Sequence, residues 1–322
     1  MVASALQSDV SKVVQLNPLM IFSSLIPLVA LVARGGGIGE LCAISLGGTL
    51  TYYHSFPGLM CDIESYIYLP MLEETGYMPK RRYAGGEEIR AYADLLADKH
   101  GLRDRALFQT SGKSLIWEKD HWICSLVTKQ KGKPDHKFNI TTNFVILASG
   151  TFTYPKLPNL PGLDSFKGKM IHTARWNYDI TGGKPALQGS ELTGLAGKKV
   201  ALVGTGATAI QVVPNVAKHA GEFYIFQRTP SAVDRRDNGE TDPDEWKRNI
   251  AKEEGWQEKR AENFQAFTEN DINAPKQDVV DDGWTNMPTI SGAYGGVSFF
   301  LPPSTMADGS RMSPTAWIRW ES

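Results

Sequence analysis

The chain has 322 residues, of which 42% are hydrophobic, and its 34 lysines and arginines almost balance its 35 aspartates and glutamates. This length and apolar content suffice for about two globular domains. The balanced charge argues against nucleic acid or an anionic membrane as a partner and favours small molecules. The three cysteines lie too far apart for a Cys-x-x-Cys zinc or dithiol site, which favours a reducing, cytoplasmic location.

Residues 19–33 form an uncharged, mostly apolar run near the N-terminus. Its fifteen residues fall short of the roughly twenty that span a bilayer. No positive cluster precedes it, as one would in a signal peptide. We therefore expect a buried strand that runs into the following glycines, with membrane association through this segment as the alternative.

A first nucleotide-binding motif follows this run. Leu28–Ala33 and the glycines Gly35 and Gly37 have the form of a strand, a tight turn and a helix start, and the two glycines are candidate cofactor contacts. Glu40 occupies the third glycine position, where helix and strand should pack closely and where its charge would lie near a pyrophosphate. An ordinary flexible loop would explain the same glycines.

The space after this motif is short. Only six residues, 41–46, separate Glu40 from Gly47, which is less than two helical turns. We therefore expect neither the full helix nor the second strand of a dinucleotide fold here, so the adenosine half of the site would lack a wall.

The middle of the chain is predicted to be scaffold. Apolar spacing over 87–100 predicts a helix that ends at Gly101. Segments 114–129 and 136–148 have strand character, with a turn at Gly132-Lys-Pro134 between them.

A second nucleotide-binding motif begins at Lys198. A strand leads into Gly204 and Gly206, and Ala209 is an accepted variant at the third position. Backbone amides at such a helix start can hold a pyrophosphate, because they lack partners and the helix dipole favours an anion. The candidate contacts are Gly204, Thr205, Gly206, Ala207, Thr208, Ala209, Ile210 and Gln211.

The strand after this helix is predicted over Glu222–Thr229. Its end lies 24 residues past Gly204, where the residue that recognises the ribose belongs. An acid there would favour NAD, whereas Arg228 suits the 2′-phosphate of NADP through charge-assisted hydrogen bonds. Arg228 and Thr229 are therefore candidate NADPH contacts, and a surface arginine on an ordinary βαβ unit is the alternative.

Phe166, Gly168, His172 and Trp176 follow the pattern Phe-x-Gly-x-x-x-His-x-x-x-Trp between the two nucleotide motifs. With Cys61-Asp-Ile-Glu-Ser-Tyr upstream and Gly204-Thr-Gly-Ala-Thr-Ala downstream, this pattern resembles the Baeyer–Villiger monooxygenases, flavoproteins that insert one oxygen atom beside a ketone carbonyl. The resemblance extends from Gly47 to about Trp284. It implies FAD and NADPH as cofactors, a ketone and molecular oxygen as substrates, and an ester or lactone as product. Its details are closest to fungal members that serve polyketide or mycotoxin pathways.

The resemblance also implies roles for individual residues. The implied FAD contacts are Thr49, Leu50, Thr51, Tyr52, Asp62, Ile63 and Tyr68, and Met60 and Cys61 are implied on the NADP side. Asp62 would also lie beside the flavin and orient the family's catalytic arginine. From spacing alone, Asp62 and Glu64 could equally be solvated loop acids. His172 is assigned a conformational role that couples NADP binding to closure, against the alternative of a structural histidine.

One part of the family pattern is missing. The catalytic arginine lies in a Lys-Arg-Pro element, and no Lys-Arg-Pro occurs here. We expect Pro79–Arg82 to be a solvated basic loop instead. Two alternatives to the monooxygenase function therefore stay open: a catalytically inactive NADP-binding remnant, and a related flavin N- or S-oxygenase.

The implied fold is α/β, with two incomplete Rossmann-like dinucleotide-binding domains, a β-meander and a helical insert. The expected insert carries Trp246, Ile250, Trp256 and Phe264 as candidate buried anchors. The expected divisions are an atypical N-terminal segment (1–34), a partial FAD-binding domain (35–150), a linker (151–197), a partial NADP-binding domain (198–240), the helical insert (241–290) and a poorly ordered tail (291–322).

Overall fold

The computed structural model describes two compact units of the chain. The first is formed by the described parts of residues 1–60 and 85–195, and the second by those of 61–84 and 196–322. Each unit thus combines two separate pieces of the sequence. The described residues are 28–32, 41–43, 54–148, 155–185, 189–228, 233, 235–269 and 275–286, with 28–32, 41–43 and 146–148 described by their backbone only.

The first unit contains a small sheet built around β1 (Leu28–Val32). This strand pairs antiparallel with both β2 (Leu41–Ala43) and β6 (Phe144–Ala148). The predicted strand is confirmed over 28–32, and β2 is a short antiparallel strand rather than the second strand of a dinucleotide fold, which was expected to be missing here. The eight residues between β1 and β2 are too few for the crossover that parallel strands require, so the second strand returns antiparallel.

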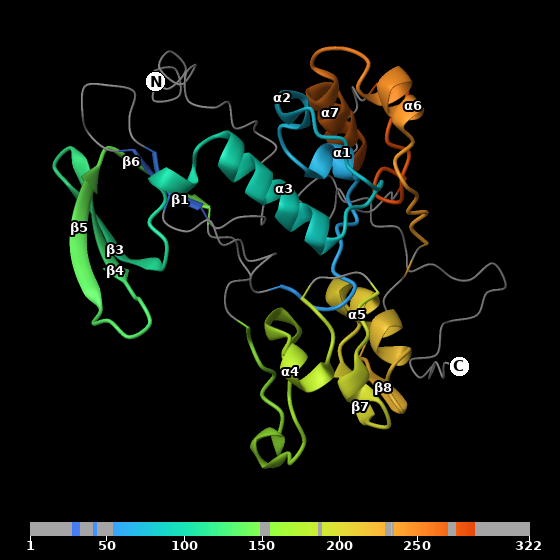
Figure 1. The fold of residues 1–322 in the computed structure, drawn as a ribbon. Helices are drawn as coiled ribbons and strands as arrows, with labels where there is room; N and C mark the ends of the chain where they lie inside the picture. The colour runs from blue at the N-terminus through green and yellow to red at the C-terminus, as the bar shows by residue number, and fades with distance from the viewer. Residues whose placement is uncertain are drawn as a thin grey trace. The chain divides into compact units, whose positions relative to one another are not determined.

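Most of the first unit's sheet structure is a three-stranded antiparallel meander (Figure 1). It consists of β3 (Thr110–Glu118), β4 (His121–Thr128) and β5 (His136–Thr142). The predicted turn at 132–134 is confirmed between β4 and β5. The strand predicted over 114–129 is instead two strands, because a hairpin with Lys119 at φ 56° interrupts it.

The meander has its own small core. Cys124 and Leu126 are buried in β4, and the partly buried apolar residues packed on them are Leu107, Leu115, Trp122, Phe138, Ile140 and Val145. These residues come from several elements of the first unit. Burial on one face of an antiparallel sheet accounts for the alternation that the sequence showed.

Helices complete the first unit. The predicted helix at 87–100 is confirmed as α3 (Gly86–Lys99), with Ile89 and Tyr92 buried (Figure 1). The remaining helices are short, namely η4 (Arg103–Arg105), η5 (Leu163–Ser165), η6 (Thr173–Arg175), α4 (Tyr178–Thr181) and η7 (Thr193–Leu195).

The second unit contains the predicted strand–helix–strand motif. β7 (Lys199–Val203) leads through a glycine turn into α5 (Ala207–Ala217), and β8 (Glu222–Phe226) returns parallel to β7. Gly221 is needed at the entry to β8, because a Cβ there would lie 2.8 Å from the Cα of Gly197. The second nucleotide-binding motif is therefore confirmed as a parallel βαβ unit.

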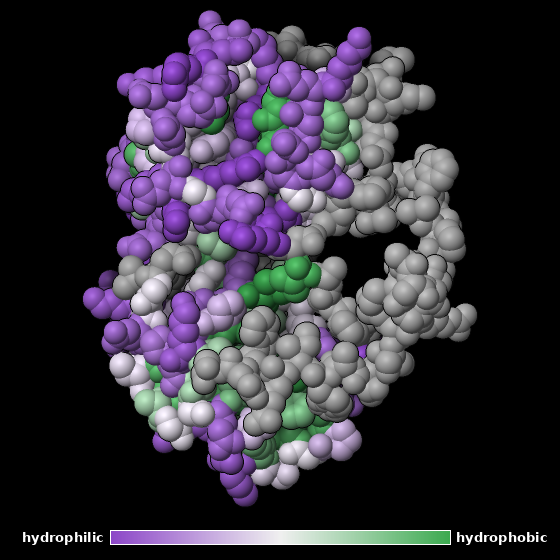
Figure 2. Space-filling view, turned by 90° about the vertical axis from the view of Figure 1, so that its right-hand side faces the viewer, coloured by the Kyte–Doolittle hydropathy of each residue, from purple (hydrophilic) through white to green (hydrophobic). Residues whose placement is uncertain are grey.

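The surface of the described residues is mostly hydrophilic in the view of Figure 2, with apolar residues gathered in a few places. Val203 of β7 and Phe226 of β8 are among the exposed large apolar residues, at 68% and 51% exposure. Along both strands, exposed and partly buried residues alternate, as in strands with one covered face.

The helical region of the second unit has more breaks than predicted. The helix-compatible segment 241–273 forms α6 (Pro243–Glu245), a π-helical turn η8 (Trp246–Ile250) and α7 (Trp256–Thr268). Gly255 precedes α7 with φ 76°, a left-handed conformation that favours glycine and ends the preceding turn. α1 (Ser65–Tyr68) and α2 (Leu72–Thr75) come from the earlier piece of the sequence.

Three of the four expected anchors of this region are buried, namely Trp246, Trp256 and Phe264, and Ile250 is partly buried. The ring of Trp246 lies between two others in edge-to-face geometry, with centroids 5.1 Å from Tyr66 and 5.0 Å from Trp256. The aromatic cluster therefore joins α1 to the later helices.

Polar contacts reinforce this junction between α7 and the two short helices. The Glu73 carboxylate accepts hydrogen bonds from the backbone N–H groups of Gly255 and Gln257, both at 2.8 Å, and so caps α7. The Gln257 side chain accepts from Leu72 N–H and donates to the carbonyl groups of Tyr66 and Leu69.

The second unit contains a buried ion pair. Glu64 is 1% exposed, and its carboxylate accepts from Arg260 Nε at 2.6 Å and from Arg260 Nη2 at 2.8 Å. Arg82 Nε lies 3.4 Å from the same carboxylate. Burial raises the pKa of Glu64, and the two guanidinium groups oppose that shift.

This ion pair excludes one alternative and corrects one expectation. Glu64 is not a solvated loop acid, because it is enclosed and paired. The predicted solvated loop at Pro79–Arg82 holds for Lys80 and Arg81, which are exposed, but it is wrong for Arg82, which joins the ion pair and donates to the carbonyl of Val280 at 2.5 Å. Its backbone N–H donates to Gly239, so the segment is tied down on both sides.

Within the described residues, no helix is long and apolar enough to cross a bilayer. Residues 28–32 of the apolar run form β1. The rest of the run lies outside the described residues.

We predict that Arg260→Met destabilises the protein by about 3–5 kcal/mol, because it leaves the Glu64 carboxylate buried with only the longer Arg82 contact. Urea denaturation measures the loss. The double variant Glu64→Leu, Arg260→Met is expected to lose less, since it removes both charges. Arg103→Met is the control, because its partners Asp94 and Asp98 are exposed, and it should unfold like the wild type. Equal midpoints for Arg260→Met and Arg103→Met would contradict the prediction.

Candidate dinucleotide and flavin sites

The turn between β7 and α5 has the shape of an anion site. Gly204 has φ 102°, and a Cβ added to Gly204 or Gly206 would meet nothing within 4 Å. No side chain caps the N-terminus of α5, whose eleven residues align their dipole toward the turn. The glycine turn thus leaves open space at a helix start, as a bound pyrophosphate requires. Ala209 is buried, as the small third position requires.

Arg228 lies at the same edge of the βαβ unit. Gly204 N–H donates to the carbonyl of Phe226 at 2.8 Å, so the end of β8 is held against the glycine turn. Arg228 follows two residues later and is exposed. The parallel pairing therefore brings the predicted phosphate-binding arginine and the predicted pyrophosphate turn to one end of the sheet.

The segment at 61–68 is held firmly within the second unit. Cys61 N–H donates to the carbonyl of Ala84 at 3.0 Å, and the Cys61 sulfur accepts from Ile63 N–H at 3.4 Å. Burial raises the pKa of the Cys61 thiol and that of the Tyr68 phenol, and these two side chains contact each other. Cys61 and Tyr68 therefore act as scaffold here, and their cofactor contacts stay predictions.

Asp62 differs from its neighbours because its side chain is 48% exposed. Its backbone carbonyl accepts from the indole Nε1 of Trp284 at 3.1 Å. Its carboxylate lies 3.9 Å from Nη2 of Arg236. Asp62 is thus held in place by its backbone while its carboxylate stays accessible, as its predicted contact with the flavin requires.

Burial of Cys61 predicts low reactivity in the folded protein, since the thiolate is the reactive form and a raised pKa suppresses it. Cys124 is also buried with a raised pKa. In a Cys42→Ser background, we therefore expect a thiol reagent at pH 8 to label neither cysteine until urea unfolds the chain. Rapid labelling of Cys61 under native conditions, found by peptide mass analysis, would sink this assignment.

The linker fingerprint makes contacts within its own segment. The Phe166 ring lies over Gly168, where a Cβ would come within 2.5 Å of the ring and would push it aside. His172 Nδ1 accepts from Ala174 N–H at 3.1 Å and caps η6. Trp176 Nε1 donates to Thr181 Oγ1 at 3.0 Å. These contacts give a structural reason for the spacing, and the conformational role of His172 stays a prediction.

Several predicted site residues fall outside the described part of the chain. They are Gly35, Gly37, Thr49, Leu50, Thr51, Tyr52 and Thr229, together with Glu40 and the predicted tail at 291–322. What the sequence predicts for these residues therefore stays a prediction.

Sequence reasoning missed three residues around the 61–68 segment, namely Arg236, Arg260 and Trp284. In the sequence, Trp284 is only the point at which the family resemblance ends. No motif includes Arg236 or Arg260. Each approaches from far along the chain, so only the fold reveals the contact.

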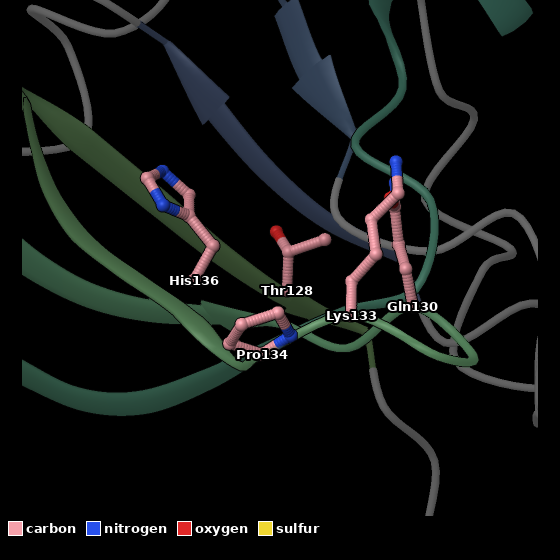
Figure 3. A pocket seen from close by; sticks show the side chains of 5 residues that line it. All are labelled: Thr128, Gln130, Lys133, Pro134 and His136. Atoms are coloured by element: carbon pink, nitrogen blue, oxygen red, sulfur yellow. The ribbon is translucent and has the colours of Figure 1, made fainter.

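A shallow hollow lies at the β4–β5 hairpin in the first unit (Figure 3). It is lined by Thr128, Gln130, Lys133, Pro134 and His136. None of these is a predicted cofactor contact. Among the described residues, no three histidine, cysteine or acidic side chains gather in a way that could hold a metal ion.

Comparison with known proteins identifies relatives over most of the chain. The flavin-binding monooxygenase-like family model matches residues 60–245. An FAD-binding monooxygenase of Aspergillus calidoustus is 47% identical over 263 residues, covering 81% of this chain and 39% of the relative. A polycyclic ketone monooxygenase of Thermothelomyces thermophilus is 46% identical over 252 residues, covering 77% of this chain and 38% of that protein.

Solved structures agree. The structure of the Thermothelomyces polycyclic ketone monooxygenase matches with a TM-score of 0.73 at 42% identity, covering 79% of this chain and 41% of that one. The OTEMO complex with FAD and NADP matches with a TM-score of 0.53 at 26% identity, covering 70% and 39%. The chain thus spans about two fifths of the length of its relatives. The resemblance seen in the sequence is confirmed, and the chain belongs to the flavin-binding monooxygenase-like family, among relatives of Baeyer–Villiger type.

Proposed function

We propose that this chain provides the NADPH-binding and part of the FAD-binding machinery of a Baeyer–Villiger-type monooxygenase. Its reaction would insert one atom of molecular oxygen beside a ketone carbonyl and yield an ester or lactone. The fungal relatives, one of them a polycyclic ketone monooxygenase, support a bulky ketone of fungal secondary metabolism as the substrate. We place the protein in the cytoplasm.

The observation that carries this proposal is the parallel β7–α5–β8 unit. Its glycine turn leaves room at a helix N-terminus, and its second strand ends next to that turn with an arginine two residues beyond. The turn would hold the pyrophosphate through backbone N–H groups, and Arg228 would bind the 2′-phosphate.

The segment at 61–68 supports the flavin part of the proposal. FAD, when bound, would supply the redox chemistry and the activation of oxygen. This chain's own residues would bind and orient it. The Asp62 side chain is half-exposed whereas Glu64 is buried, so the Asp62 carboxylate is the acid in this segment that can meet a ligand or the family's arginine.

The NADP-only alternative has one observation in its favour. β1 and β2 pair antiparallel, whereas a complete dinucleotide fold would place a parallel strand beside the first. The experiments below distinguish a flavin monooxygenase from a protein that binds NADP alone. No observation in the structure favours a flavin N- or S-oxygenase.

Arg228→Ala is expected to weaken NADPH binding about tenfold to a hundredfold, the range for losing charge-assisted hydrogen bonds to a phosphate. NADH binding should change little, because NADH lacks the 2′-phosphate. Titration followed by NAD(P)H fluorescence measures both affinities. The control Arg235→Ala removes an arginine that is 90% exposed and paired with Asp237. Equal losses of NADPH and NADH would refute the 2′-phosphate role.

The oxygenase function is tested with the purified chain supplied with FAD. A monooxygenase should retain flavin after gel filtration, oxidise NADPH faster when a polycyclic ketone is present, and give a product heavier by one oxygen atom. NADPH binding without retained flavin would instead support the NADP-only alternative. Flavin reduction without an oxygenated ketone would contradict the Baeyer–Villiger reaction.

A further inference from the structure

Asp62 lies in a small constellation that its sequence motif does not contain. Arg236 and Trp284 come from distant positions and contact its carboxylate and its backbone carbonyl, respectively. All three residues belong to the second unit. The Arg236 guanidinium also lies 5.5 Å from the centroid of the Trp284 ring, a distance at which a cation and an aromatic face attract each other.

The space around Arg236 is shaped for its guanidinium. A Cβ on Gly283 would lie 1.8 Å from Arg236 Nη1, so a side chain at position 283 would displace the guanidinium from this place. Nη1 is buried without a hydrogen-bond partner, which is costly for a charged group. A buried donor without a partner is rare in folded proteins and calls for an explanation. A role of the Arg236 guanidinium toward the neighbouring Asp62 would explain it.

The supports of Arg236 and Trp284 are themselves anchored. The carbonyl of Arg236 accepts from Asn238 N–H at 2.8 Å, and the Asn238 side chain exchanges two hydrogen bonds with the backbone of Tyr83. Asp282 is buried, and its carboxylate accepts from the N–H groups of Trp284 and Thr285. The backbone on which Arg236 and Trp284 lie is therefore held by hydrogen bonds.

We propose that Arg236 is a positioning residue for Asp62. Trp284 fixes the backbone of Asp62, and the Arg236 guanidinium draws the carboxylate to one side. At 3.9 Å the contact is an electrostatic attraction rather than a hydrogen bond, so the carboxylate oxygens keep capacity for another donor. This inference rests on the proposed flavin function for the identity of that donor, but the positioning itself does not depend on a cofactor.

The first test uses the protein without added flavin. Asp62→Asn, Arg236→Met and the double variant form a cycle measured by melting temperature. If Arg236 and Asp62 interact, the shift of the double variant differs from the sum of the single shifts. Amide hydrogen exchange at Asp62 and Ile63 should also quicken in Arg236→Met. Additive shifts together with unchanged exchange would overturn the inference.

The second test adds FAD. Arg236→Met is expected to weaken FAD binding about twofold to fivefold, as for a half-exposed ion pair, and to shift the absorption spectrum of the bound flavin. Arg236→Lys should recover part of both effects, since it restores the charge. Arg235→Met, at the adjacent exposed arginine, should change neither, and NADPH affinity should stay constant in all variants. A spectrum and an affinity that do not change in Arg236→Met would overturn the role toward the flavin.

The two tests keep this inference separate from the proposed function. If the wild-type chain binds no FAD, the proposed function fails by that measurement, and the cycle without flavin still decides whether Arg236 positions Asp62. If FAD binds but the cycle is additive and amide exchange is unchanged, the proposed function stands and the inference fails.

Discussion

The packing of the second unit depends on the buried carboxylate of Glu64. Glu64 lies in the middle of the segment predicted to contact the flavin, and two arginines from different parts of the chain neutralise it. An unpaired buried charge costs several kcal/mol. The 61–68 segment, the 79–82 loop and α7 therefore have to come together for the Glu64 carboxylate to be buried. Because Cys61 and Asp62 lie two or three residues before Glu64, the burial of Glu64 also limits where they can lie.

The same ion pair separates two kinds of acid within three residues. Glu64 is enclosed and paired, and so serves structure. Asp62 keeps an accessible carboxylate, with contacts to its backbone and at longer range to Arg236. Carboxylates two positions apart can thus differ completely in what they are free to do, because the chain bends at residues 62 and 63 before α1 begins.

The parts of the fold that the sequence predicted well are local. The βαβ unit at 198–228 follows from an apolar strand, a glycine turn and helical periodicity, all encoded within about thirty residues. The α3 helix and the 132–134 turn are equally local. The predictions that failed concern the hairpin at Lys119 and the anchored Arg82, and the antiparallel pairing of β2 was not predicted at all.

The sequence by itself determined the family and the kind of chemistry predicted for the dinucleotide turn, because a motif with fixed spacing meets a ligand through its own backbone. Only the tertiary structure decided which of the two acids at 62 and 64 is accessible, and which arginines stand beside them. Arg82 and Arg260 lie 18 and 196 residues from Glu64, and Arg236 lies 174 residues from Asp62. A charge at such a separation finds its partner through the packing of the whole unit, and no short pattern records that packing.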